Sequence, residues 1–87
     1  MQEFSVTLQA TSGLHARPAT ELVRLLKPFA SEIILQKGER RGNAKSLIQC
    51  LKLGLIQGDT ITFHLDGTDE EEALGTLKTF FKQWNMP

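Results

Sequence analysis

Hydrophobic and polar residues alternate along several segments of the chain, and this period of two predicts strands that bury one face. Phe4, Val6 and Leu8 show the alternation most plainly. The segments that carry it are 4–9, 32–37 and 60–66. A weaker strand is expected at 40–43, because its glycine adds nothing to a core and its arginines indicate an exposed edge.

Other segments repeat hydrophobic residues at the three- and four-residue spacing of a helix face. The first helix is expected to begin near Ala16 and to end near Lys27, because Pro28 disfavours a helical conformation in the residue before it. The last helix has a long hydrophobic face, formed by Ala73, Leu74, Leu77, Phe80, Phe81 and Trp84. Both helices therefore need a hydrophobic surface to cover.

Two capping boxes predict where helices begin, since a hydroxyl side chain and an acid or amide three residues later can satisfy free N–H groups. Ser46 and Gln49 predict a short helix over 47–53. Thr68 and Glu71 predict the start of the last helix.

The elements follow the order β-α-β-β-α-β-α. Because strand faces and helix faces cover each other, we expect an α+β fold with helices on one face of a mostly antiparallel four-stranded sheet. Eighty-seven residues are enough for one domain, 1–87, with a core of modest size.

Composition argues against several classes of function. Ten basic and ten acidic side chains give a formal net charge of zero, which indicates neither a nucleic-acid partner nor attraction to an anionic membrane. No hydrophobic run approaches the length of a membrane span, and the N-terminus lacks the features of a signal peptide. The single cysteine, Cys50, cannot form an internal disulfide, so we expect a reducing, cytoplasmic location.

Neither a metal ion nor a nucleotide is expected as a cofactor. Structural zinc normally takes four Cys or His ligands, and the chain offers only His15, His64 and Cys50. No phosphate-binding loop of the Gly-x-x-x-x-Gly-Lys-Ser/Thr type occurs. His64 alternates outward in its strand and is expected to be a surface residue, and Cys50 is expected to be partly buried in its helix.

The segment 13–19 carries the chemistry, because His15 lies there in a turn directly before the first helix. Gly13 allows a positive φ angle as the chain enters the helix. The first N–H groups of a helix are free and partly positive, so those of Ala16 and Arg17 can receive the oxygens of an anion. A neutral imidazole in this place can attack a phosphoryl group, and the guanidinium of Arg17 suits phosphate oxygens. The alternative is a histidine that only caps a helix beside a solvated arginine, and spacing alone does not decide between the two.

The stretch Gly13-Leu14-His15-Ala16-Arg17-Pro18-Ala19 resembles the active-site signature of HPr, the family of histidine phosphocarriers in the bacterial phosphotransferase system. A second stretch, 45–59, resembles the regulatory serine segment of that family, and the two are separated as in the family. The resemblance covers nearly the whole chain. It implies an open-faced α+β sandwich and a phosphoryl carrier rather than an enzyme.

The resemblance also implies roles for particular residues. His15 would accept a phosphoryl group on Nδ1 from enzyme I and pass it to sugar-specific enzyme IIA domains, with Arg17 stabilising the group. Ser46 would be a regulatory phosphorylation site for an HPr kinase/phosphorylase. Leu47, Ile48 and Leu51 would form an exposed docking patch on a monomeric carrier.

Several alternatives stay open. The chain can instead be a carrier of a regulatory, nitrogen-type branch, or a binding module without phosphotransfer. The three docking residues can be core, although Leu53, Leu55 and Ile56 are expected to fill the core nearby, and Ser46 can be a plain helix cap. Departures from the family pattern bear on partner affinity and not on the chemistry at the histidine; they occur at Gly38, Gly42, Cys50 and His64.

Overall fold

The structure, a computed structural model, describes residues 1–86. Its elements follow the predicted order: β1 (Gln2–Thr7), α1 (Ala16–Leu26), β2 (Glu32–Lys37), β3 (Arg40–Asn43), α2 (Leu47–Lys52), β4 (Thr60–Asp66) and α3 (Glu70–Trp84). The first strand begins and ends two residues earlier than the alternation indicates. Leu8 remains buried, but its backbone bonds to the loop residues Gly58 and Asp59 instead of continuing the strand.

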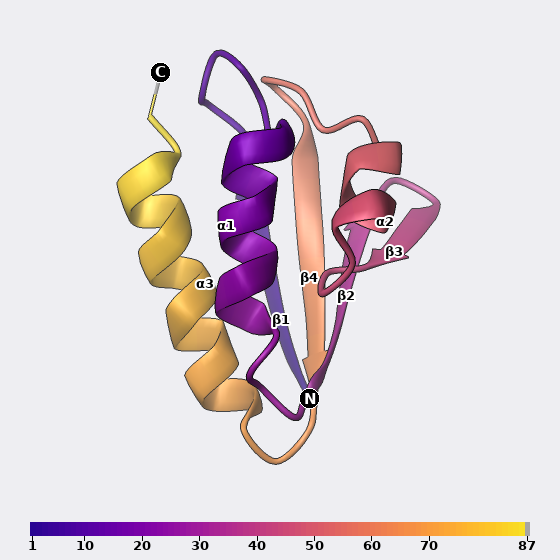
Figure 1. The fold of residues 1–87 in the computed structure, drawn as a ribbon, viewed down its shortest axis with the longest axis vertical. Helices are drawn as coiled ribbons and strands as arrows, with labels where there is room; N and C mark the ends of the chain where they lie inside the picture. The colour runs from indigo at the N-terminus through magenta and orange to yellow at the C-terminus, as the bar shows by residue number, and fades with distance from the viewer. Residues whose placement is uncertain (87) are drawn as a thin grey trace.

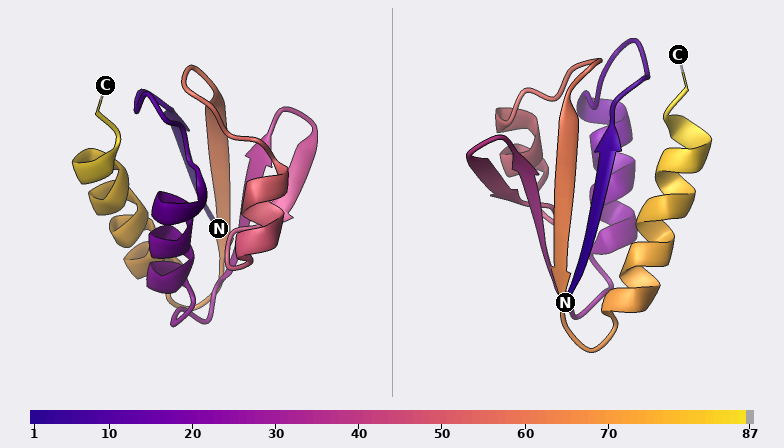
Figure 2. Two further views of the ribbon diagram at one scale, coloured as in Figure 1. Left: turned by 45° about the horizontal axis from the view of Figure 1, so that its top comes forward. Right: turned by 180° about the vertical axis from the view of Figure 1, so that it is seen from behind.

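The strands form one antiparallel sheet in the order β1-β4-β2-β3. All three helices cover the same face of this sheet, and the other face is open (Figure 1 and Figure 2). The predicted α+β arrangement, with helices on one side of a four-stranded sheet, is therefore confirmed.

The core lies between the sheet and the helices. Ile33, Leu35, Ile61, Phe63 and Leu65 point inward from the two central strands and are completely buried. The helices cover them with Leu22, Leu26, Leu77 and Phe81, among others. Each such side chain contributes about 1.5–3 kcal/mol by leaving water, so burial of this core is the main favourable contribution to folding.

The capping box at the start of α2 is only half formed. The Oγ atom of Ser46 accepts a hydrogen bond from the backbone N–H of Gln49 at 3.3 Å, as predicted. The Gln49 side chain, however, accepts from the N–H of Asn43 at 2.7 Å and does not return to Ser46. The nearby end of β3 supplies a free N–H group that the capping pattern does not take into account.

The second predicted capping box is wrong. Asp69, not Thr68, is the N-cap residue of α3, and its side chain makes no bond within the helix. Its carboxylate instead accepts from the backbone N–H groups of Ala30 and Ser31, at 2.8 and 2.9 Å. The α1–β2 loop lies against the start of α3. The N–H groups of this loop donate to the Asp69 carboxylate, which is therefore not available to cap its own helix.

Candidate functional site

His15 is the N-cap residue of α1. Its backbone is extended, with φ −83° and ψ −172°, and its carbonyl accepts the first helical hydrogen bond from Ala19 at 2.9 Å. The imidazole is exposed and makes no capping hydrogen bond. The N–H groups of the first turn are thus not capped by His15, and Pro18, in the same turn, lacks an N–H that would need a partner.

Gly13 controls how the chain enters this turn. Its φ of +66° agrees with the predicted positive value, and a Cβ atom there would lie 2.4 Å from the carbonyl oxygen of Leu55. The next residue, Leu14, is buried, and its N–H donates to the same carbonyl at 3.0 Å. The α2–β4 loop therefore fixes the backbone directly before His15.

Arg17 lies on the exposed side of the first turn of α1. Within residues 1–86 its guanidinium takes part in no ion pair. Glu21, one turn along the helix, pairs instead with Arg24 at 2.7 Å. The planar donor group of Arg17 is consequently available to an anion held at the start of the helix.

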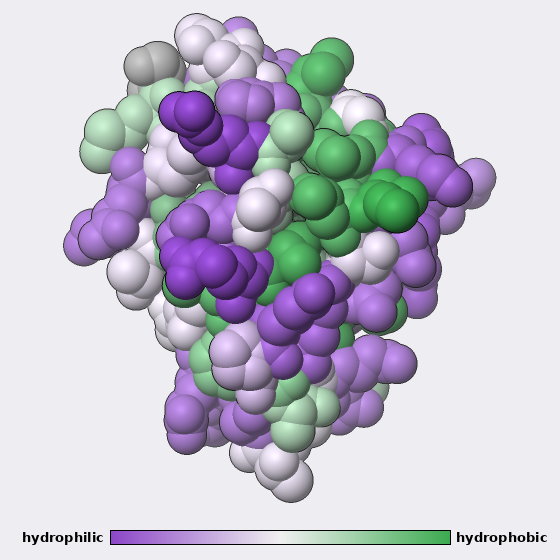
Figure 3. Space-filling model, viewed as in Figure 1, coloured by the Kyte–Doolittle hydropathy of each residue, from purple (hydrophilic) through white to green (hydrophobic). Residues whose placement is uncertain are grey.

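Hydrophobic surface gathers over α2, as Figure 3 shows at the upper right. Ile48 is 67% exposed and Leu51 is 40% exposed, whereas Leu47 is half-buried against the core. Figure 1 places α2 and the start of α1 at the same end of the molecule. The structure thus leaves two of the three predicted docking residues exposed near His15.

Ile56 extends this surface, although from the sequence it was a candidate to fill the core. Its side chain is 62% exposed, whereas Leu53 and Leu55 are buried as predicted. The N–H of Ile56 donates to Asp59 at 2.9 Å in a turn, so its side chain points away from the core. The turn signal at Gly58-Asp59, shortly after Ile56, is the feature of the sequence that indicates a surface position. We call the exposed surface of Ile48, Leu51 and Ile56 the α2 patch.

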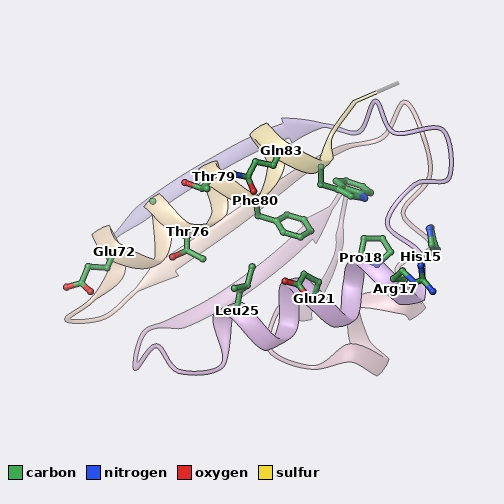
Figure 4. Close-up of a pocket in the computed structure, with 12 residues that line it drawn as sticks. His15, Arg17, Pro18, Glu21, Leu25, Glu72, Thr76, Thr79, Phe80 and Gln83 are labelled. Atoms are coloured by element: carbon green, nitrogen blue, oxygen red, sulfur yellow. The ribbon is translucent and has the colours of Figure 1, made fainter.

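A groove of about 1090 Å³ runs between α1 and α3 and reaches His15 and Arg17 at one end (Figure 4). Pro18, Leu25 and Phe80 are among its apolar lining residues. The groove could not be predicted from the sequence, because the distance between two helices depends on their packing and not on either helix alone. The groove keeps this side of the histidine open to a partner.

The remaining candidates have structural roles. Cys50 is 1% exposed, and burial raises the pKa of its thiol to about 11, as befits a core residue. His64 lies on the open face of the sheet, where its Nε2 atom is 2.7 Å from the Gln36 side chain.

Among the described residues, no three His, Cys, Asp or Glu side chains are grouped so that they could hold a metal ion. No helix in 1–86 has the length and hydrophobicity needed to cross a bilayer.

Comparison with known proteins shows the family of the chain. A family model described as "PTS HPr component phosphorylation site" matches residues 2–83. The chain is 40% identical over 77 residues to the phosphocarrier protein HPr of Haemophilus influenzae, covering 88% of this chain and 91% of the relative. It is 43% identical over 77 residues to that of Buchnera aphidicola, with the same coverage of each chain.

Solved structures give the same result. The histidine-containing phosphocarrier protein of a mycoplasma matches with a TM-score of 0.92 and 30% identity, over 98% of each chain. The phosphocarrier protein HPr of Bacillus anthracis matches with a TM-score of 0.84 and 33% identity, over 91% of this chain and 94% of that one.

Fold and sequence together define a phosphoryl carrier and not an enzyme. The chain belongs to the HPr family of phosphocarrier proteins of the phosphotransferase system.

Proposed function

We propose that this carrier accepts a phosphoryl group on His15 from enzyme I and passes it to sugar-specific enzyme IIA domains. The observation that supports this role is the exposed imidazole at the N-terminus of α1, close to the Arg17 guanidinium (Figure 4), which forms no ion pair within residues 1–86. Because the chain has no nucleotide loop, the phosphoryl group has to come from another protein.

The site residues divide the chemistry between them. A lone pair on the imidazole, at Nδ1 by resemblance to the family, forms a bond to phosphorus while the bond between phosphorus and the donor breaks. The N–H groups of Ala16 and Arg17 receive phosphoryl oxygens at the positive end of α1. The Arg17 side chain offsets the negative charge on the oxygens of the moving group. Transfer to enzyme IIA reverses these steps and returns the imidazole to its free state.

Two histidine variants test the acceptor. After incubation with enzyme I and phosphoenolpyruvate, wild-type protein should gain one phosphoryl group by mass, and His15→Ala should gain none. His64→Ala is the matched control, since His64 lies on the open sheet face and should not affect the gain. Acid-labile phosphate on His15→Ala would refute the acceptor assignment.

We also propose that partners dock on the α2 patch. Ile48 and Ile56 are the most exposed of its members and lose little by facing water in the free protein, because a single apolar side chain on a surface is tolerated. A carrier has to leave one partner before it meets the next, so a small interface suits its task.

Ser46 is the proposed regulatory site, modified by an HPr kinase/phosphorylase. Its Oγ atom already faces the first turn of α2, where added negative charge is tolerated. The phosphate would lie next to Leu47 and Ile48, so it would disturb docking rather than the fold.

The carrier is proposed to act as a single-domain monomer in the cytoplasm. The support for the reducing location is that Cys50, the single cysteine, is free and buried.

A further inference from the structure

The side chain of Asn85 ties the end of α3 to the segment that leads to His15. Asn85 is the C-cap residue of α3. Its Oδ1 atom accepts hydrogen bonds from the backbone N–H groups of Gln9, at 2.6 Å, and Ala10, at 3.3 Å. Its Nδ2 atom donates to the carbonyl of Thr7 at 2.8 Å. Both ends of the amide therefore have suitable backbone partners.

The α2–β4 loop holds the same segment from another side. The N–H of Leu8 donates to the carbonyl of Asp59 at 2.8 Å, and the N–H of Gly58 donates to the carbonyl of Leu8 at 2.7 Å. The side chain of Gln57 donates to the carbonyl of Gln9 at 3.0 Å. The segment is thus fixed between this loop and Asn85.

The position of the His15 ring depends on this backbone. The imidazole makes no capping hydrogen bond that would orient it. The N–H of Gly13 donates to the carbonyl of Ala10 at 3.0 Å, which closes a turn between the segment held by Asn85 and the histidine. Ala10 thus supplies one of the two backbone bonds that hold residues 13 and 14, the other being the bond from Leu14 to Leu55, so a looser Ala10 should loosen the turn before His15.

We propose that Asn85 is a positioning residue for phosphoryl transfer: it holds the backbone of residues 7–10 so that the His15 ring keeps the orientation that transfer needs. The proposal rests on His15 being the acceptor. Asn85 acts through the backbone and does not touch the phosphoryl group. Because transfer requires the attacking nitrogen, phosphorus and leaving atom to be nearly in line, a looser backbone should lower kcat. Docking on α2 should be unaffected.

Asp69 offers a matched control at the other end of α3. Its carboxylate accepts from the backbone of Ala30 and Ser31, so it also fixes a loop to one end of the same helix. That loop lies at the end of the molecule away from the start of α1 (Figure 1). Asp69→Ala should therefore remove similar bonds without reaching His15.

The experiment compares Asn85→Ala, Asn85→Asp and Asp69→Ala in transfer from enzyme I with phosphoenolpyruvate, together with their melting temperatures. Asn85→Ala should lower kcat about fivefold or more and leave KM within about twofold of wild type. Amide hydrogen exchange should become faster at Gln9 and Ala10. Asn85→Asp keeps the acceptor for those two N–H groups but loses the donor to Thr7, so it should recover part of kcat. Asp69→Ala should melt earlier yet transfer at the wild-type rate.

An Asn85→Ala protein with wild-type kcat, or an equally large loss of kcat in Asp69→Ala, would overturn the proposal. If Asn85→Ala does not fold, Asn85→Asp serves as the test. A lowered kcat at constant KM would support the proposal, and an unchanged kcat would overturn it. Failure of the proposed function would give a different result. His15→Ala would then still become phosphorylated, whichever residue stands at position 85.

Discussion

At the end of the molecule where α3 begins, the polar groups of two loops bind one another. Asp69 accepts from Ala30 and Ser31, and the side chain of Glu70 accepts from the N–H of Gly67 at 3.1 Å. Ser31 is completely buried, and a Cβ atom on Gly67 would lie 2.5 Å from its Cα atom. The residues here are packed and paired with each other, and little is left to offer a partner.

At the opposite end, where α1 begins, the groups are left free. The His15 ring makes no capping bond, and Arg17 forms no ion pair within the described part of the chain. Ile48 and Ile56 expose most of their apolar surface. The backbone before His15 is nevertheless tightly held, by Leu55 and Asn85 among others.

The difference leads us to expect that exposed groups at the His15 end serve transfer and that packed groups at the Asp69 end serve stability. Exposed charges and single exposed apolar side chains contribute little to the free energy of unfolding. Such side chains can therefore bind a partner without a cost to stability, provided that the backbone that carries them is rigid. Substitutions at the Asp69 end should change stability alone, and those at the His15 end should change transfer.

The largest effect should come from a pair of glycine variants. Gly13→Ala combines a positive φ with a Cβ 2.4 Å from a carbonyl oxygen, and should lower the free energy of unfolding by about 2–4 kcal/mol. Gly67→Ala should cost about 1–3 kcal/mol by crowding Ser31. Urea unfolding measures both costs. Among folded molecules, only Gly13→Ala should slow transfer. Equal transfer rates for the two variants would contradict the claim that transfer depends on the His15 end and not on the Asp69 end.

Arg17→Ala should slow transfer and leave the melting temperature unchanged. A charge-assisted hydrogen bond to phosphate is worth about 1.5–3 kcal/mol, which corresponds to roughly tenfold to a hundredfold in rate. Arg17→Lys keeps the charge but loses the planar fork, so its rate should lie between the two. Arg24→Ala is the matched control, because Arg24 forms an exposed pair with Glu21. Rapid-quench kinetics in which Arg17→Ala matches Arg24→Ala would contradict the role.

Ile48→Asp should weaken docking without unfolding the protein. Ile48 is 67% exposed, so the variant should melt near wild type, while KM for transfer from enzyme I rises by about five- to thirtyfold, corresponding to about 1–2 kcal/mol. Ile34→Asp places the same charge on the open sheet face and should leave KM unchanged. A large drop in melting temperature for Ile48→Asp would place Ile48 in the core instead.

Ser46→Asp should have a smaller effect on the same step. A new surface charge contributes about 0.2–1 kcal/mol, so KM should rise by no more than about fivefold. Circular dichroism and melting should stay near wild type, because the carboxylate still faces the first turn of α2. An unchanged KM would count against electrostatic gating at this position.

Acid should weaken the Asp69 end by a small amount. The hydrogen bond from Ser31 and that from the Ala30 backbone lower the pKa of Asp69 below its ordinary value. A carboxylate with a lowered pKa stabilises the folded state above its unfolded pKa, and this contribution is lost as the pH falls below about 4. Melting curves of Asp69→Asn should therefore show less dependence on pH between neutral and acidic solution than those of wild type. Identical pH dependence in both proteins would contradict a stabilising contribution from the Asp69 carboxylate.

Most of the fold could be predicted because its elements depend on local patterns. The alternation at Ile61, Phe63 and Leu65 defines a buried strand face without knowledge of its neighbours. The turn at Gly13 was visible for the same reason, since its backbone conformation is a local property.

The contacts that hold the loops could not be predicted, because they join residues that are distant in sequence. Asp69 bonds to Ser31, 38 residues away, and Asn85 bonds to Gln9, 76 residues away. No local pattern distinguishes such a side chain from an ordinary helix cap. Ile56 was misplaced because hydrophobicity alone does not show on which side of a turn a residue lies.

The most direct measurement is nuclear magnetic resonance of protein labelled with ¹⁵N at its histidine rings, before and after phosphorylation by enzyme I. The account predicts that the ring nitrogens of His15, including the Nδ1 atom that bonds to phosphorus, change their signals on phosphorylation, while both nitrogens of His64 keep theirs. A changed His64 ring, or a phosphorylated protein in which the His15 signals stay the same, would contradict the central claim that His15 carries the phosphoryl group.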